Sequence, residues 1–183
     1  MYVGTQVGAR NDSDFEQWAQ LGVVNVCSDP PGDARTWIKD DLARHREKLE
    51  SYGITLDMVQ IPLSSTPLDT SQSPNIMLGK SPERDRDIEH IQLMTANCAQ
   101  AGIPAWKYNR SLLGVPRVAR TPGRGGSSYS TWKLSQAVAD PPLTRAGRVT
   151  ADIAWERITY FLERVIPVCN EYKIRAACHP HDP

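Results

Sequence analysis

The last residues of the sequence carry the clearest potential for chemistry. His179 and His181 lie two residues apart, with Asp182 beside them, directly after an apolar run that ends at Cys178. Alternate side chains of an extended chain point the same way, so the two imidazoles would share one side. Imidazole and carboxylate groups together suit a borderline divalent metal ion. A histidine that only makes structural hydrogen bonds is the alternative, and the position at a strand end favours the metal.

The segment from 109 to 150 differs in composition from the rest of the chain. It holds a single acid, Asp140, against seven basic residues: Arg110, Arg117, Arg120, Arg124, Lys133, Arg145 and Arg148. A connection of this length is usually a lid, a binding loop or disordered. Guanidinium groups bind carboxylate or phosphate in a bidentate way. Arg120 and Arg124, beside a glycine-rich stretch, are therefore candidates for contact with an anionic substrate, and a solvated basic loop is the equally weighted alternative.

Two further polar residues follow another apolar run. Tyr108 and Asn109 stand directly after residues 103–107. An asparagine at the end of a buried strand can bind a substrate hydroxyl or carboxylate, and a simple turn residue is the alternative. We name both residues as candidates for substrate contact, and the sequence identifies no general base.

These candidates depend on the elements that position them. We expect strands at 2–5, 23–27, 54–59, 103–107 and 174–178. Between them we expect helices at 13–20, 36–52, 81–101 and 150–172. Ser13 is the expected cap of the first helix. Pro82 should occupy the first position of the third helix, and Pro167 should kink or end the last one.

Strict alternation of strands and helices predicts a parallel α/β sheet. A doubly wound nucleotide fold would require a glycine-rich turn after the first strand, and no G-x-G-x-x-G stands there. We therefore expect a (β/α)8 barrel. A complete barrel takes roughly 250 residues, so the 183 residues suggest about five β/α units of an incomplete barrel. The expected organisation is one partial barrel over 1–183, with 109–150 as a long basic active-site loop.

Composition narrows the partners and the compartment. The 183 residues carry 21 basic and 21 acidic side chains, and 40% of them are hydrophobic. Such a balance excludes a disordered chain and argues against nucleic acid as a partner. Neither a run of about 20 apolar residues nor a secretory signal is visible, so we expect a cytoplasmic protein with no membrane partner. Its four cysteines read as reduced thiols: Cys27, Cys98, Cys169 and Cys178.

Several of these motifs together resemble one known family. The similar pieces are Val3-Gly4-Thr5-Gln6, Pro30-Pro31, Tyr108-Asn109, Gly123-Arg124-Gly125-Gly126 and the closing His179-Pro180-His181-Asp182-Pro183. They resemble the N-terminal portion of the D-mannonate dehydratase family, which belongs to the xylose isomerase-like (β/α)8 barrels. The family pattern at the fifth strand is H-P-D-D-P, and here His181 replaces the first aspartate.

The resemblance implies a hydro-lyase of hexuronate breakdown that depends on Mn²⁺ or Fe²⁺. It would convert D-mannonate to 2-keto-3-deoxygluconate and water, and His179 would be a metal ligand. The family's other ligands, a cysteine, a histidine and an aspartate, come from later strands. A sugar isomerase or epimerase of the same superfamily is one alternative. An inactive truncated barrel, held in a homo-oligomer, is the other.

Overall fold

The computed structural model describes residues 4–6 and 11–180. Four strands form one parallel sheet in the order β1-β2-β3-β6, with bounds β1 Asn25–Cys27, β2 Thr55–Gln60, β3 Ala105–Tyr108 and β6 Arg175–Cys178. The first expected strand, 2–5, lies partly outside the described residues, and its Thr5 makes a parallel bridge with Val26 at the edge of the sheet. The alternating α/β order predicted from the sequence is confirmed.

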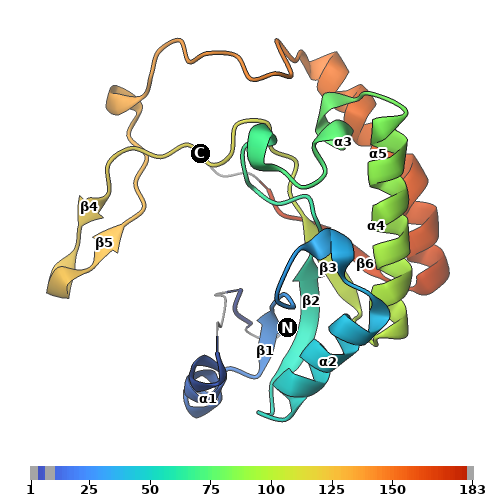
Figure 1. The fold of residues 1–183 in the computed structure, drawn as a ribbon. Coiled ribbons are helices and arrows are strands. Elements are labelled where there is room, and N and C mark those ends of the chain that lie inside the picture. The colour runs from blue at the N-terminus through green and yellow to red at the C-terminus, as the bar shows by residue number, and fades with distance from the viewer. Residues whose placement is uncertain (1–3, 7–10, 181–183) are drawn as a thin grey trace.

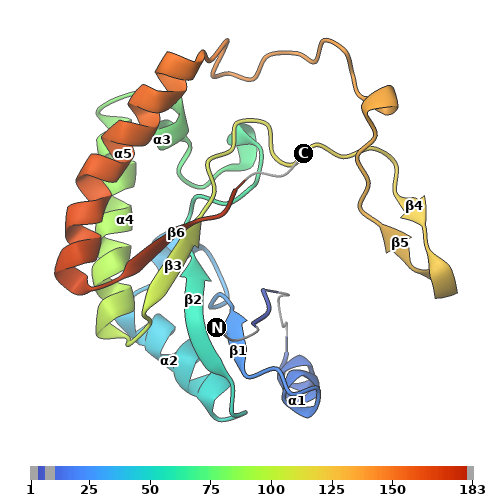
Figure 2. The same cartoon turned by 180° about the vertical axis from the view of Figure 1, so that it is seen from behind.

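The helices lie on one face of this sheet. Their bounds are α1 Asp12–Gln20, α2 Lys39–Glu50, α3 Pro74–Leu78, α4 Glu83–Gln100 and α5 Ala151–Tyr172. Helices α2, α4 and α5 form a layer behind the strands, and the opposite face has no helix over it among the described elements (Figures 1 and 2). Helices stand outside the strands in a (β/α)8 barrel. The helix-free face of the sheet is therefore the inner face, and the described residues form part of a barrel.

The core fills the space between the strands and the helix layer. Trp106 of β3 and Phe161 of α5 are both fully buried there, together with Leu42 of α2 and Ile91 of α4. The Trp106 indole Nε1 donates a hydrogen bond to Thr95 Oγ1 at 3.1 Å, so its polar atom is satisfied inside the core. Burying a large apolar side chain stabilises a fold by about 1.5–3 kcal/mol. This layer is therefore the stable part that holds the strand ends in place.

Three helix starts differ from those predicted. Asn11 caps α1 by accepting a hydrogen bond from the Asp14 backbone N–H at 3.1 Å, so Ser13 lies inside the helix rather than before it. The helix expected from residue 36 begins at Lys39, because a short 3-10 turn over 34–36 comes first. Pro82 stands just before α4 rather than within it.

Pro167 was predicted to kink or end the last helix, and the helix does not end there. Helix α5 continues through it to Tyr172. Phe161 and Val165 before the proline, and Cys169 after it, are all buried. Packing on both sides of Pro167 offsets the loss of one backbone hydrogen bond.

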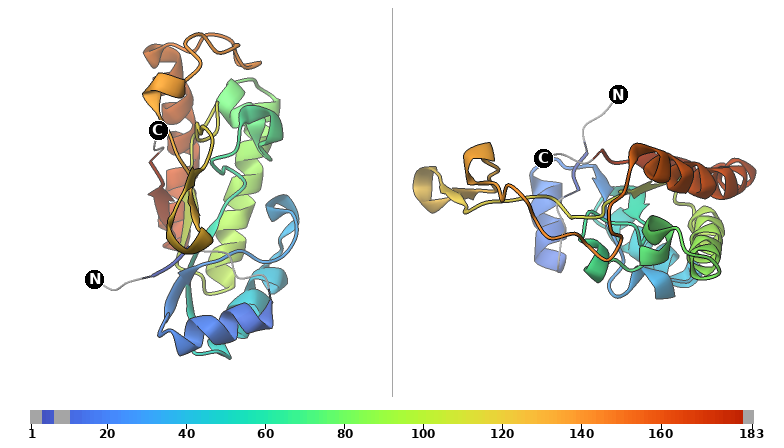
Figure 3. Two further views of the ribbon diagram at one scale, coloured as in Figure 1. Left: turned by 90° about the vertical axis from the view of Figure 1, so that its left-hand side faces the viewer. Right: turned by 90° about the horizontal axis from the view of Figure 1, so that it is seen from above.

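The long loop between β3 and α5 projects from the layered part of the molecule. It contains a small antiparallel hairpin, β4 Thr121–Pro122 with β5 Ser128–Tyr129. The hairpin stands well away from the sheet and helices in Figure 1 and in the right-hand view of Figure 3. None of the described helices has the length and apolarity needed to cross a membrane.

Candidate site at the carboxyl ends of β3 and β6

The structure brings Asn109 and His179 together. Tyr108 of β3 pairs with Cys178 of β6, so the next residue of each strand stands at the same level. The His179 N–H donates to the Tyr108 carbonyl at 2.8 Å, and Asn109 Nδ2 donates to the His179 carbonyl at 3.3 Å. Asn109 is 5% exposed, and its own N–H donates to the Leu63 carbonyl at 2.7 Å. Two of the predicted site residues are thus adjacent at the carboxyl edge of the sheet, where barrel enzymes have their active sites.

Tyr108 points to the other side of the sheet. Its ring packs 5.6 Å from that of Trp106 and 5.5 Å from that of Phe161 in α5, as centroid distances. Burial and the neighbouring Cys178 thiol raise the pKa of the Tyr108 hydroxyl to about 12, so it stays protonated at neutral pH. Successive side chains of a strand face opposite ways. The structure therefore places Tyr108 in the helix-facing core, away from the face that Asn109 and His179 share.

The same alternation places Lys107 on the inner face, and the sequence reasoning missed this residue. Its Nζ donates to Gln6 Oε1 at 2.5 Å, across the inner face from the first segment of the chain. A hollow of about 620 Å³ lies on this face, and Asp57 and Arg175 are among the residues that line it. Lys107 stands two positions before Asn109, so the alternation of strand side chains would have placed it on the same face as Asn109. The inner face thus carries a few charged side chains among apolar ones such as Ala105 and Ala177.

Two residues at the carboxyl end of β1, Asp29 and Cys27, have pKa values that burial raises. Burial is the largest influence on Asp29 and raises the pKa of its carboxyl, although one of its oxygens accepts from the Gln60 N–H at 2.7 Å. Burial also raises the pKa of the Cys27 thiol to about 11. A thiol binds metal or attacks a substrate as the thiolate. Burial therefore favours the protonated form of the free Cys27 thiol at neutral pH.

His179 has the arrangement of a histidine that can bind a metal. Its Nδ1 lies 2.9 Å from the Pro180 carbonyl oxygen, and a carbonyl can only accept a hydrogen bond. Nδ1 therefore carries the proton, which leaves the lone pair on Nε2. Metal-binding histidines usually donate their other N–H in this way. Among the residues that the structure describes, no three His, Cys, Asp or Glu side chains cluster as a complete metal site, and His181 and Asp182 lie outside those residues.

Arg120 and Arg124 lie on the projecting loop, so the structure does not bring them to His179. The Arg120 guanidinium donates to the Ser128 hydroxyl and to the Ser128 carbonyl, both at 2.7 Å. Arg124 begins the short turn that joins β4 to β5. In this structure Arg120 stabilises the hairpin, and both arginines contribute positive charge to it.

Several solved structures have a fold similar to that of this chain. Solved structures of similar fold are xylose isomerase-like barrels, among them a D-psicose 3-epimerase with a TM-score of 0.57 at 14% identity, covering 95% of this chain and 51% of that one. A mannonate dehydratase from Streptococcus suis serotype 2 is more similar in structure, with a TM-score of 0.78 at 19% identity over 100% of this chain and 55% of that one. At these identities the likeness concerns the fold.

Sequence comparisons then point to one family within this class. The family model described as D-mannonate dehydratase (UxuA) matches residues 141–183. The mannonate dehydratase of Shouchella clausii is 27% identical to this chain over an alignment 212 positions long. This alignment covers 96% of this chain and 56% of the relative. Mannonate dehydratase 2 of Halalkalibacterium halodurans is 27% identical over 171 residues, 80% of this chain and 47% of the relative. The chain spans about half the length of these relatives, and its resemblance to the N-terminal portion of the mannonate dehydratases is confirmed.

Proposed function

We propose that this chain forms part of the active site of a metal-dependent sugar-acid dehydratase that converts D-mannonate to 2-keto-3-deoxygluconate and water. The observation that carries the proposal is the pairing of Asn109 and His179 at the carboxyl edge of the sheet. The similarity to mannonate dehydratases supplies the reaction class.

In this proposal His179 binds a divalent ion, Mn²⁺ or Fe²⁺, through Nε2. The hydrogen bond from Nδ1 to the Pro180 carbonyl fixes the tautomer and the ring orientation that this role requires. A bound divalent ion supplies Lewis-acid stabilisation of negative charge on substrate oxygens. The remaining ligands would come from outside the described residues, in keeping with the family pattern.

Asn109 is the proposed substrate contact. One hydrogen of its Nδ2 goes to the His179 carbonyl, so its Oδ1 can accept a hydrogen bond from a substrate hydroxyl. The backbone bond to Leu63 and the near-complete burial hold this side chain in position. We propose that Tyr108 acts on the substrate only through Asn109, by fixing the end of β3 in the core.

The basic loop at 109–150 has an electrostatic part in the proposal. Arg120 and Arg124 raise the local concentration of an anionic substrate through the field of the loop. The reaction itself removes the proton next to the carboxylate and expels the neighbouring hydroxyl, which leaves as water. The resulting enol becomes the keto product. Loss of that proton builds negative charge at the carboxylate, which nearby positive charge stabilises.

Turnover of D-mannonate tests the proposal. The protein expressed from its full reading frame is incubated with Mn²⁺, or with Fe²⁺ without oxygen, and the α-keto acid product is measured as its semicarbazone. We expect turnover that falls at least about 100-fold in His179→Gln, because metal ligands are essential to such chemistry. His90→Gln is the matched control, since His90 is exposed on α4. Absence of turnover in the folded protein, or equal loss in both variants, contradicts the proposal.

A further inference from the structure

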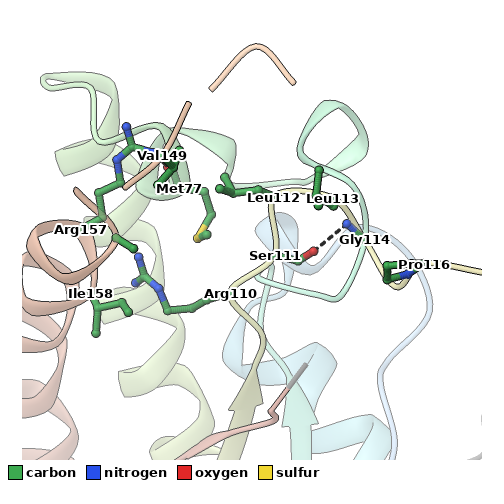
Figure 4. A pocket seen from close by; sticks show the side chains of 11 residues that line it. Met77, Arg110, Ser111, Leu112, Leu113, Gly114, Pro116, Val149, Arg157 and Ile158 are labelled. Carbon is green, nitrogen blue, oxygen red and sulfur yellow. Dashed lines mark hydrogen bonds between the residues drawn. The ribbon is translucent and has the colours of Figure 1, made fainter. Parts of the chain in front are cut away.

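A second cavity lies on the helix-facing side of the strand ends. Its volume is about 480 Å³, and it is enclosed by α3, the root of the long loop and the first turns of α5 (Figure 4). The walls are mainly apolar, with Met77, Leu112 and Ile158 among them. The side chains of Arg110 and Arg157 both extend into this space (Figure 4). A cavity of this size and composition is typical of small-molecule sites.

Arg110 is a partly buried cation, and one of its donor atoms, Nη1, is buried without a hydrogen-bond partner among the described residues. Its guanidinium lies 5.6 Å from the centre of the Phe161 ring. Burial lowers the pKa of Arg110 to about 10, which leaves it charged at neutral pH. A buried charged donor without a partner is unfavourable. An anion that accepts from Nη1 would remove this penalty.

The neighbouring groups do not supply such an anion. Arg157 has the same charge as Arg110, and its Nη1 donates to the Met77 carbonyl at 2.7 Å. The carboxylate next to Arg157 in sequence, Glu156, is engaged with Arg84 in an ion pair of 2.9 Å. Two guanidinium groups in one apolar cavity repel each other unless an anion lies between them.

We propose that this cavity binds a small monocarboxylate with a short apolar chain. The carboxylate accepts from Arg110 and Arg157, since guanidinium matches carboxylate geometry. The apolar chain lies against Met77, Leu112 and Ile158. A sugar acid does not fit this description, because its hydroxyls would face apolar walls without partners.

This second site is separate from the one at Asn109 and His179. Arg110 directly follows Asn109, and adjacent residues of an extended chain point to opposite sides. The proposed ligand therefore binds behind the strand end, and the proposal does not rest on the dehydratase function. Because the cavity includes the root of the loop from Ser111 to Gly114, an occupied site would stabilise that root.

Calorimetric titration with hexanoate, acetate and 1-hexanol tests the proposal. We expect saturable binding of hexanoate, with a dissociation constant at least tenfold below those of acetate and 1-hexanol. Arg110→Met should weaken hexanoate binding at least tenfold, and Arg157→Met should also weaken it. The matched control is Arg164→Met. Arg164 lies on α5, as Arg157 does, but its guanidinium carbon stacks 3.2 Å from the centre of the Tyr160 ring, and it does not line the cavity.

Three results would overturn it. Equal affinity for acetate and hexanoate would mean that the site senses charge alone. Equal affinity for 1-hexanol and hexanoate would mean that it senses apolar surface alone. Unchanged hexanoate binding in Arg110→Met would place the ligand elsewhere. Circular dichroism shows whether that variant folds. If it does not, the NMR signals of the Ile158 and Met77 methyl groups are followed in the unaltered protein as hexanoate is added. If hexanoate does not shift these signals, the proposal is overturned.

Discussion

The layered part of the molecule and its long loop differ in both packing and charge. Strands and helices bury a continuous core, in which Trp106, Phe161 and Leu42 are fully enclosed. Between 117 and 148 no side chain is buried, and apolar residues such as Leu134 and Val138 are more than 70% exposed. The free energy of folding therefore resides in the layered part.

Charged residues are also distributed unequally between the layered part and the loop. The loop from 109 to 150 has seven basic residues against one acid, which leaves 14 basic and 20 acidic residues elsewhere. The net charge of zero is therefore the sum of a basic loop and an acidic remainder of the chain. The layered region holds the strand ends in place, and in our proposal the basic loop supplies the field that attracts an anion.

A pair of tryptophan variants gives the largest expected contrast between the two regions. Trp106→Ala should lower the free energy of unfolding by about 3–5 kcal/mol, because it opens a cavity in the core. Trp132→Ala, on the loop, should change it by less than about 0.5 kcal/mol, as exposed positions usually do. Urea unfolding followed by circular dichroism measures both values. Similar losses in the two variants would show that the loop is part of the cooperative core.

The pH dependence of stability should also come from the layered part. Burial lowers the pKa of His45 to about 4, and its Nε2 lies 3.1 Å from Ser28 Oγ. Since the unfolded state has a histidine pKa near 6.5, it binds more protons than the folded state between pH 6.5 and 4. Stability is thus full above pH 6.5 and is lost as the pH falls, by about 2 kcal/mol between pH 7 and pH 5.

His45→Gln isolates this contribution. Urea unfolding at pH 7 and at pH 5 should show a smaller decrease for the variant than for the unaltered protein, by about that same 2 kcal/mol. The loop contains no histidine, so the variant tests the layered part alone. An identical decrease in both proteins would contradict the assigned pKa.

The order of the elements could be predicted from the sequence, because apolar runs and amphipathic stretches alternate along it. Element bounds were harder, since Asn11 competes with Ser13 as a cap and tertiary packing carries α5 through Pro167. Of the candidate site residues, Asn109 and His179 could be placed at strand ends by counting.

Other features depend on three-dimensional contacts that no local pattern records. The periodicity of β3 alone does not say which of its faces meets the helices, so the core position of Tyr108 required the structure. Arg110 appeared only as one of seven loop cations, yet it lines a mainly apolar cavity. The direction in which the loop projects likewise follows from contacts at its root.

We propose that a metal ion binds at the edge of the sheet where His179 lies beside Asn109, and not on the basic loop. Titrating Mn²⁺ into ¹⁵N-labelled protein tests it directly, because a bound paramagnetic ion broadens nearby amide signals even when binding is weak. The account predicts selective broadening of Asn109, Cys178 and His179, with Gly125 and Asp140 of the loop unaffected, and loss of this pattern in His179→Gln. Broadening centred on the loop, or a pattern unchanged in His179→Gln, would contradict the account.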